Sequence, residues 1–172
     1  MITYFLLVGV FFATIAFRFL YEHLRKQGRL DPRDKLVFAL VFLDMCAMWA
    51  SWSNLCPLDP WRIEFPTWLR WAGLAANVLG WGLFLGGVIQ LKGLENIEHL
   101  ATTGLYAKIR HPMYTGFLMW LSGWPLWNNS ATSLLVGAVA AAAVWRWRSE
   151  EERHMESKYG QAWREYRAKT WL

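Results

Sequence analysis

Cysteine is scarce in this chain: among 172 residues there are only two, Cys46 and Cys56. Their separation matches no metal-binding or redox motif, so the sequence predicts no metal site. A free cysteine in an apolar segment behaves as a small hydrophobic residue, and packing is the expected role of both.

The chain also lacks an internal repeat, a low-complexity linker and a second block of distinct composition, so we expect one domain over residues 1–172. The first apolar segment has neither the basic start nor the small-residue cleavage site of a signal peptide. No platform of basic and aromatic residues lies outside the apolar segments. This absence argues against nucleic-acid binding despite a net charge of +5.

Apolar residues, by contrast, are abundant: 55% of the chain is hydrophobic, and 13 residues are tryptophan. A helix that crosses a bilayer needs about 20 predominantly apolar residues. Candidate spans cover residues 2–21, 35–54, 68–91, 112–127 and 130–147. The sequence therefore predicts an all-α, polytopic membrane protein with about five spans.

Lysine and arginine gather in the loop after the first span, in the loop after the third and in the tail after the fifth. The other two loops together hold only Arg62, with Arg70 at the start of the third span. Positive residues favour the cytoplasmic side of a membrane. We therefore expect the N-terminus outside and the C-terminus in the cytosol, in a bacterial or archaeal inner membrane.

Two features inside the spans are informative. Gly82 and Gly86 form a small-xxx-small pair, which predicts close helix packing there. Asp44 lies mid-span, where an ionised carboxylate is costly and usually faces the bundle interior or a cavity. A structural hydrogen bond to Asn77 and a catalytic role are the two interpretations of Asp44.

A polar cluster precedes the fourth span. Proline suits the first turn of a helix, so the span begins at Pro112, with Arg110 and His111 at its entrance. The free amides and partial positive charge of a helix N-terminus suit an anionic group such as a carboxylate. With Tyr106 and Tyr114 close by in sequence, this cluster predicts a ligand site.

A second polar cluster follows the fifth span and begins with Glu150, Glu151 and Glu152. Adjacent helical residues point about 100° apart, so at most two of these carboxylates aim at the bundle. They either hold a cationic or hydroxyl-bearing ligand or pair with neighbouring arginines.

The tail from Ser149 onward predicts an amphipathic helix on the cytosolic face, with Gly160 as a possible bend. Its apolar side carries Met155, Tyr159, Ala162, Trp163, Tyr166 and Thr170. This helix is either an interfacial anchor or a cover over the end of the bundle.

Residues 100–116, LATTGLYAKIRHPMYTG, resemble the signature of the isoprenylcysteine carboxyl methyltransferase and phospholipid methyltransferase superfamily of integral membrane enzymes. The signature is matched by Gly104, Tyr106, Arg110, His111, Pro112, Tyr114 and Gly116. A second family element is matched by Glu151, Glu152, Tyr159, Gly160, Trp163 and Tyr166. The resemblance covers about residues 70–170.

The resemblance implies S-adenosylmethionine as methyl donor, bound at the cytosolic end of the fourth and fifth spans. Together with the residue argument above, it implicates in donor binding Glu98, His99, Leu100, Ala101, Tyr106, Arg110, His111, Pro112, Met113, Tyr114 and Glu151. The family usually has a histidine where this chain has Glu98, and the histidine is displaced here to His99. Prenylcysteine enzymes place a substrate-binding arginine where this chain has Trp147, so the flanking Arg146 and Arg148 are candidates to orient the acceptor.

The sequence therefore predicts S-adenosylmethionine-dependent methyl transfer to a lipid-like or hydrophobic small acceptor with an oxygen, nitrogen or sulfur nucleophile. A sterol-reductase-like enzyme using NADPH is one alternative, because such enzymes share an Arg-His-x-x-Tyr element and a tail pattern that is matched here by Lys158, Tyr159, Gly160, Trp163 and Tyr166. A non-enzymatic transporter, with Asp44 as a proton site, is the other.

Overall fold

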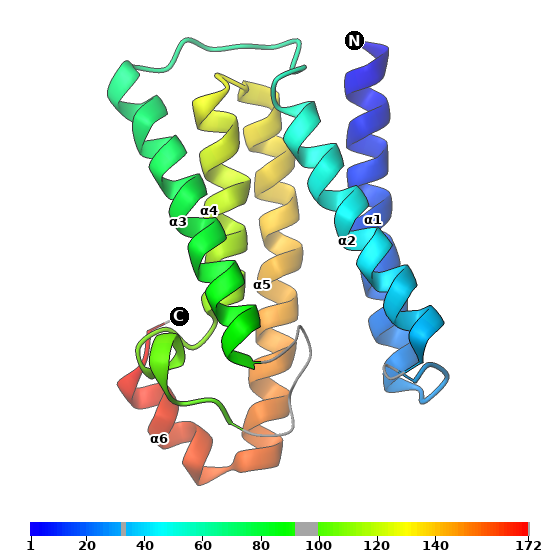
Figure 1. Cartoon of the computed structure of the whole chain (residues 1–172), viewed down its shortest axis with the longest axis vertical. Coiled ribbons are helices and arrows are strands. Elements are labelled where there is room, and N and C mark those ends of the chain that lie inside the picture. The colour runs from blue at the N-terminus through cyan, green and yellow to red at the C-terminus, as the bar shows by residue number, and fades with distance from the viewer. Residues whose placement is uncertain (32–33, 92–99, 172) are drawn as a thin grey trace.

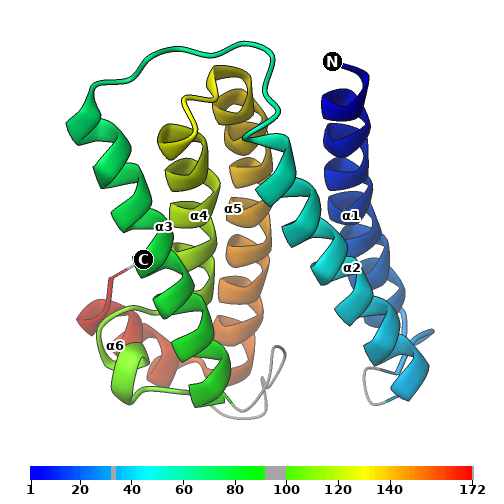
Figure 2. The ribbon, with the colours of Figure 1, turned by 45° about the horizontal axis from the view of Figure 1, so that its top comes forward.

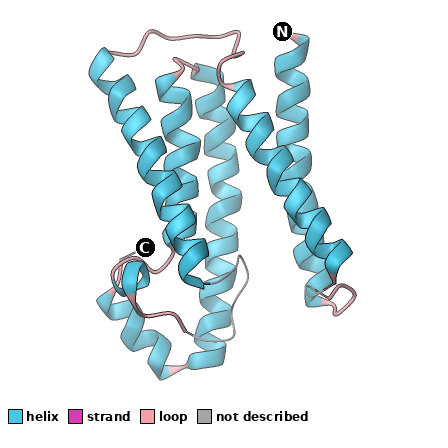
Figure 3. Cartoon of the chain, viewed as in Figure 1, coloured by secondary structure: helices cyan, strands magenta, loops and turns pink. Residues whose placement is uncertain are grey.

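The computed structural model describes residues 1–31, 34–91 and 100–171, in which the extended regular elements are all helices (Figure 3). In chain order they are α1 (Ile2–Lys26), α2 (Lys35–Leu55), α3 (Thr67–Leu91), the 3-10 turn η1 (Gly104–Ala107), α4 (Pro112–Trp127), α5 (Ala131–Tyr159) and α6 (Gln161–Lys169). The all-α prediction is confirmed for these residues.

Three of the described helices, α1, α2 and α3, are long and apolar enough to cross a membrane. Helix α4 has 16 residues, and α5 has 29 residues, of which the second half is strongly charged. The predicted bend at Gly160 is confirmed, but the amphipathic helix does not begin at Ser149, because residues 149–159 continue α5 without a break. Glutamate, arginine and lysine in this stretch are good helix formers, whereas Gly160, at φ +53°, ends the helix.

The helices form two groups (Figures 1 and 2). Helices α3, α4 and α5 lie side by side, and α1 pairs with α2. The gap between the α1–α2 pair and the other three helices widens toward the end of the bundle where α6 lies. The two groups therefore meet most closely at the opposite end.

Glycines bring α3 and α4 into backbone contact. A Cβ atom added to Gly80 would lie 2.6 Å from the carbonyl oxygen of Gly116, and one added to Gly73 would lie 2.8 Å from that of Gly123. The predicted close packing is confirmed for Gly86, where an added Cβ would lie 2.7 Å from Leu105, but is wrong for Gly82, where a Cβ meets no atom within 4 Å. The glycines in backbone contact with α4 are spaced seven residues apart, which is two helical turns, so the four-residue pattern selected the wrong face.

The end of the bundle away from α6 is fixed by buried aromatic and polar contacts. Trp52 of α2 is fully buried between Phe11 of α1 and Trp120 of α4, with ring centroids 4.8 and 5.8 Å away. Asp59 accepts hydrogen bonds from the backbone nitrogen and the hydroxyl of Ser133, at 2.8 and 2.9 Å, in the first turn of α5. A carboxylate is stabilising at a helix N-terminus, so this loop holds α5 in place.

The expected hydrogen bond between Asp44 and Asn77 is not formed. Asn77 is buried in α3, and its Nδ2 atom has no hydrogen-bond partner among the described residues. Asp44 instead lines a cavity and interacts electrostatically with Arg18 of α1. The prediction of a hydrogen bond from Asn77 to Asp44 is therefore wrong.

Candidate functional site

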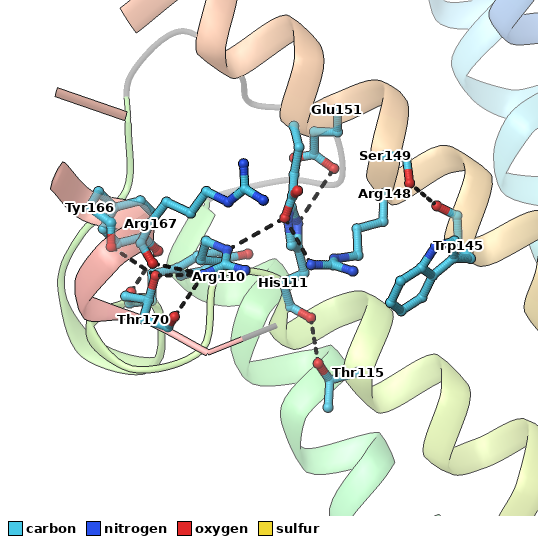
Figure 4. A network of polar contacts seen from close by, with 12 residues as sticks. Arg110, His111, Thr115, Trp145, Arg148, Ser149, Glu151, Tyr166, Arg167 and Thr170 are labelled. Atoms are coloured by element: carbon cyan, nitrogen blue, oxygen red, sulfur yellow. Dashed lines mark hydrogen bonds and ion pairs between the residues drawn. The ribbon is translucent and has the colours of Figure 1, made fainter. Parts of the chain in front are cut away.

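The two polar clusters of the sequence meet at the α6 end of the bundle, where Figure 4 shows His111 close to Arg148 and Glu151. The carboxylate of Glu152 joins them. Its Oε1 atom lies 3.1 Å from Nε2 of His111, 3.0 Å from a guanidinium nitrogen of Arg148 and 3.4 Å from Nε of Arg110. The hydrogen bond from His111, with the charges of Arg148 and Arg110, lowers the pKa of Glu152 to about 2 although burial opposes this. Glu152 is therefore an anion that fixes the His111 ring, which is only 5% exposed.

Glu151 takes the other side of the same imidazole. Its Oε2 atom lies 3.9 Å from Nδ1 of His111, and its carboxylate interacts with the hydroxyl of Tyr114 one turn into α4. About a third of its side chain is exposed. Of the two neighbouring carboxylates, that of Glu152 is occupied by contacts within the protein, whereas that of Glu151 remains accessible to a ligand.

The C-terminal segment is clasped to the loop that carries the first motif. Arg110 donates hydrogen bonds from one guanidinium nitrogen to the carbonyl oxygens of Thr170 and Arg167, at 2.7 and 3.0 Å. The backbones also pair, since the nitrogen of Arg110 donates to Trp171 and the nitrogen of Trp171 donates to Lys108, at 2.9 and 2.8 Å. These bonds join segments that are about sixty residues apart in the chain.

The apolar face of α6 packs on the protein. Trp163 and Tyr166 are buried in a cluster with Met155 of α5, and Leu100 packs against it. Ala162, expected on the same face, is exposed because the break at Gly160 changes the helical register. Of the two interpretations of the tail, the structure supports a cover over the end of the bundle.

A cavity of about 470 Å³ opens between the α1–α2 pair and the other helices. Motif residues and α1 side chains form its polar part, including Arg110, His111, Glu151, Glu22 and Arg25. Its apolar part is lined by Met45, Met48, Trp49, Phe84, Phe117 and Trp147. One cavity therefore joins a charged region to a hydrophobic one, as an amphiphilic ligand or a pair of unlike ligands would require.

Most of the predicted ligand residues line this cavity: Leu100, Ala101, Tyr106, Arg110, His111, Met113, Tyr114 and Glu151. Pro112 is fully buried behind it and packs near Gly87 of α3. Glu98 and His99 lie outside the described residues.

Arg146 and Arg148 are not among the residues that line the cavity. Arg146 is 69% exposed and pairs with Glu150, while Arg148 pairs with Glu152. The residue between them, Trp147, does line the cavity. The structure therefore brings an indole, rather than either guanidinium, to this position of the wall.

Three hydrogen-bond donors on the cavity wall are buried without a partner among the described residues: the hydroxyl of Tyr106 and the indole nitrogens of Trp147 and Trp163. Burial, and secondarily the charge of Glu151, raises the pKa of Tyr106 above its usual range, so the hydroxyl stays protonated. Unpaired buried donors are costly. A ligand rich in hydroxyl and carboxylate oxygens would supply their partners.

The hydrogen-bonding groups of the cavity wall fit S-adenosylmethionine. Glu151 offers an accessible carboxylate to an ammonium group or ribose hydroxyls, and the unpaired donors offer partners to oxygens. Tyr106 and Glu151 are neighbours in this wall, since the charge of Glu151 acts on the hydroxyl of Tyr106.

The expected pairing of the carboxylates with neighbouring arginines is confirmed for Glu152, whose spacing of four residues from Arg148 is typical of an ion pair on one helix face. The different surroundings of Glu151 and Glu152 were not predicted. The resemblance placed Trp147 at the position of the family's arginine, but nothing in the sequence indicated that its indole lines the cavity.

Comparison with known proteins identifies the family of the chain. The profile of the family described as phospholipid methyltransferase matches residues 70–162, which is more than half of the chain. Protein-S-isoprenylcysteine O-methyltransferase of Schizosaccharomyces pombe is 36% identical over 82 residues, covering 44% of this chain and 33% of that protein. Protein-S-isoprenylcysteine O-methyltransferase B of Arabidopsis thaliana is 31% identical over 112 residues, covering 58% of this chain and 55% of that protein.

These alignments span between a third and just over half of the length of the two relatives. No solved structure matches the chain. The matched region nevertheless contains the first motif, the glycine contacts between α3 and α4, and the second element from Glu151 as far as Gly160. On the family match and the site that it encloses, the chain belongs to the phospholipid methyltransferase family of membrane proteins.

Proposed function

We propose that this protein is a multi-pass membrane methyltransferase that uses S-adenosylmethionine and methylates a lipid-like or amphiphilic small acceptor at the cytosolic face. One observation carries the proposal: a single cavity joins the motif residues to an apolar wall between the two helix groups. A polar methyl donor and a hydrophobic acceptor can therefore meet in it.

The residues proposed to hold the donor are Leu100, Ala101, Tyr106, His111, Pro112, Met113, Tyr114 and Glu151. Glu151 suits the ammonium group or the ribose hydroxyls, while Tyr106 and Trp163 supply unpaired donors for oxygens. Arg110 is largely occupied by Glu152 and by the carbonyls of the tail, so its proposed role is to keep the cover closed.

The bound donor would supply an activated methyl group on a sulfonium. The protein then has to align the acceptor with that methyl group and exclude water. Correct orientation alone gains about 7–11 kcal/mol in favourable cases. Met155, Trp163 and Tyr166 bury the end of the cavity under α6, which supports the exclusion of water.

We propose five spans, with α4 and the first half of α5 as the fourth and fifth. Helix α4 follows α3 along its length, since Gly123 contacts Gly73 near one end and Met113 contacts Gly87 near the other. These contacts run from Gly73 to Gly87, roughly 21 Å along α3, so α4 follows the greater part of that candidate span. The basic loops then favour an external N-terminus and a cytosolic C-terminus.

The direct test is calorimetric titration of the purified protein in nanodiscs with S-adenosylmethionine and with its demethylated product. We expect saturable binding of both and no competition by NADPH. Host lipids incubated with the protein and isotopically labelled donor should then contain a species heavier by one methyl group. Absence of donor binding, or binding of NADPH in its place, would contradict the proposal.

A further inference from the structure

The cavity contains a second candidate for chemistry, on a different wall from the motif residues. Asp44 of α2 lines it together with Met45, Met48 and Trp49 of the same helix. It lies nine residues beyond Lys35, which is roughly 14 Å along the helix. This residue belongs to the N-terminal helices, outside the region that matches the family profile.

The other carboxylates of the α1 wall and of the cavity mouth are neutralised by nearby cations. Glu22 lies 3.5 Å from Arg18 and 4.0 Å from both Arg25 and Lys26. Glu150 pairs with Lys26 and with Arg146. Their charges are already compensated within the protein.

Asp44 has a weaker counter-charge. The cation that acts on it is Arg18, whose guanidinium also pairs with Glu22 and lies over the ring of Tyr21, 5.2 Å from its centroid. Within the family region, Glu151 is similarly uncompensated, since its ion-pair contact is His111 at 3.9 Å. The cavity thus presents one accessible carboxylate on the donor wall and another on the α2 wall.

We propose that Asp44 binds the acceptor and takes the proton from its nucleophilic atom, so that the acceptor is a protic nucleophile (an amine, hydroxyl or thiol) rather than a carboxylate. This inference rests on the proposed function. In the step, the bond from sulfur to the methyl carbon breaks and a bond from the acceptor atom to that carbon forms. Sulfur keeps the electron pair and becomes a neutral thioether, while the acceptor proton passes to the carboxylate of Asp44.

The same geometry disfavours a carboxylate acceptor. A second carboxylate beside Asp44 would be repelled in a wall built from Met45, Met48 and Trp49, because charges interact strongly where water is excluded. It would also need no proton acceptor. Arg18 is a poor compensating partner for it, since its charge is shared with Glu22.

The test compares the wild type, Asp44→Asn and Asp44→Glu in nanodiscs. Three acceptor probes are used: dioleoyl phosphatidylethanolamine, a long-chain phenol and N-acetyl-S-farnesylcysteine, whose reactive group is a carboxylate. We expect the wild type to methylate at least one protic probe and to leave the carboxylate probe unmethylated. Asp44→Asn should lower kcat on the protic probe about 100-fold or more, because general-base catalysis typically contributes that much.

Donor affinity separates this inference from the proposed function. It should stay within about 2-fold of the wild type in Asp44→Asn, and Asp44→Glu should recover part of the rate. Glu64→Gln, an exposed change in the loop between α2 and α3, is the matched control for removing one negative charge. Its rate and affinity should equal those of the wild type.

A pH profile distinguishes a proton acceptor from a merely structural carboxylate. The charged and titratable groups that line the cavity with Asp44 are Arg18, Glu22, Arg25, Lys26, Tyr106, Arg110, His111, Tyr114, Glu150, Glu151, His154 and Tyr166. The wild type and Asp44→Asn share these groups, so the difference between their pH profiles isolates the contribution of Asp44. With the phenol probe, the Asp44→Asn rate should approach that of the wild type as rising pH ionises the phenol.

Two results would overturn the inference alone: normal turnover in Asp44→Asn with normal donor binding, or efficient methylation of the farnesylcysteine carboxylate by the wild type. A parallel pH profile for the two proteins would also overturn it. Failure of the wild type to bind the donor would instead overturn the proposed function, and this inference with it.

Discussion

Tyr166 of α6 donates a hydrogen bond from its hydroxyl to the backbone carbonyl of Tyr106, at 2.6 Å, in a buried setting. Burial raises the pKa of Tyr166 to about 12, so the hydroxyl keeps its proton, and hence the bond, at any pH used for assay. This bond ties the C-terminal cover to the loop that supplies the unpaired Tyr106 hydroxyl. The ordering of α6 over the end of the bundle is therefore coupled to the ordering of the residues that line the cavity.

Removing that bond should loosen the cover. Tyr166→Phe leaves the carbonyl of Tyr106 without its hydrogen-bond donor, at a cost of about 1–3 kcal/mol. The affinity for the methyl donor should therefore fall about 10-fold. Calorimetric titration measures the affinity, and limited proteolysis of α6 reports the loosening. Glu165→Gln, on the exposed side of α6, is the control and should change neither. Equal affinity in Tyr166→Phe and the wild type would contradict the coupling.

The carboxylate of Glu152 should contribute stability only while it is ionised. Its pKa is about 2 in the folded protein against an ordinary value of 4.5, so its contribution is complete above pH 4.5 and is lost as pH falls toward 2. This difference corresponds to at most about 3 kcal/mol. Thermal unfolding in detergent should show Glu152→Gln well below the wild type at pH 7. The gap should narrow below pH 4.5, and a gap independent of pH would contradict the assignment.

Glu151 and His111 should matter for the donor more than for the fold. Glu151→Gln removes a charge proposed to face the donor, and a hydrogen bond to a charged group is worth about 1.5–3 kcal/mol, so affinity should fall about 10- to 100-fold. His111→Ala should also weaken binding by removing the ring that lies between Glu151 and Glu152.

The control for the Glu151 experiment is Glu156→Gln, which is exposed on the same helix and pairs with Arg164. Circular dichroism of each variant checks that the helices are retained. Unchanged donor affinity in both Glu151→Gln and His111→Ala would mean that the donor binds elsewhere.

The α3–α4 contact offers a matched pair of glycine substitutions. Gly80→Ala places a methyl group 2.6 Å from the carbonyl of Gly116 and should destabilise the bundle by about 1–3 kcal/mol. Gly82→Ala, two residues away, meets no atom within 4 Å and should be neutral or slightly stabilising, because alanine favours helices. Thermal unfolding of both proteins in the same detergent checks the contrast, and equal melting temperatures would refute it.

Much of the fold follows from local sequence properties. Long apolar runs specify α1, α2 and α3, and Pro112 marks the start of α4. The glycine interface was assigned to the wrong face, because a spacing of seven residues is visible only when the partner helix presents its own glycines. The extension of α5 to Tyr159 was missed because its charged second half resembles a surface helix when considered without its neighbours.

The site was predictable where a motif linked residues to a common ligand, and less so where tertiary contacts assign roles. Glu151 and Glu152 are adjacent and chemically identical, yet one is tied to His111, Arg110 and Arg148 and the other is open to the cavity. Asp44 of α2 lines the same cavity as the motif residues, an arrangement that no local pattern encodes. Such roles depend on packing at a distance.

The hydrogen bonds between Arg110 and the tail also set the stage of synthesis at which the pocket can form. The carbonyl groups that hold Arg110 belong to residues 57 and 60 positions further along the chain. When the motif loop is synthesised, the residues that hold Arg110 have not yet been translated. The pocket therefore matures only after the polypeptide has been made as far as Trp171, and shortened translation products that stop before α6 should insert into the membrane without acquiring it.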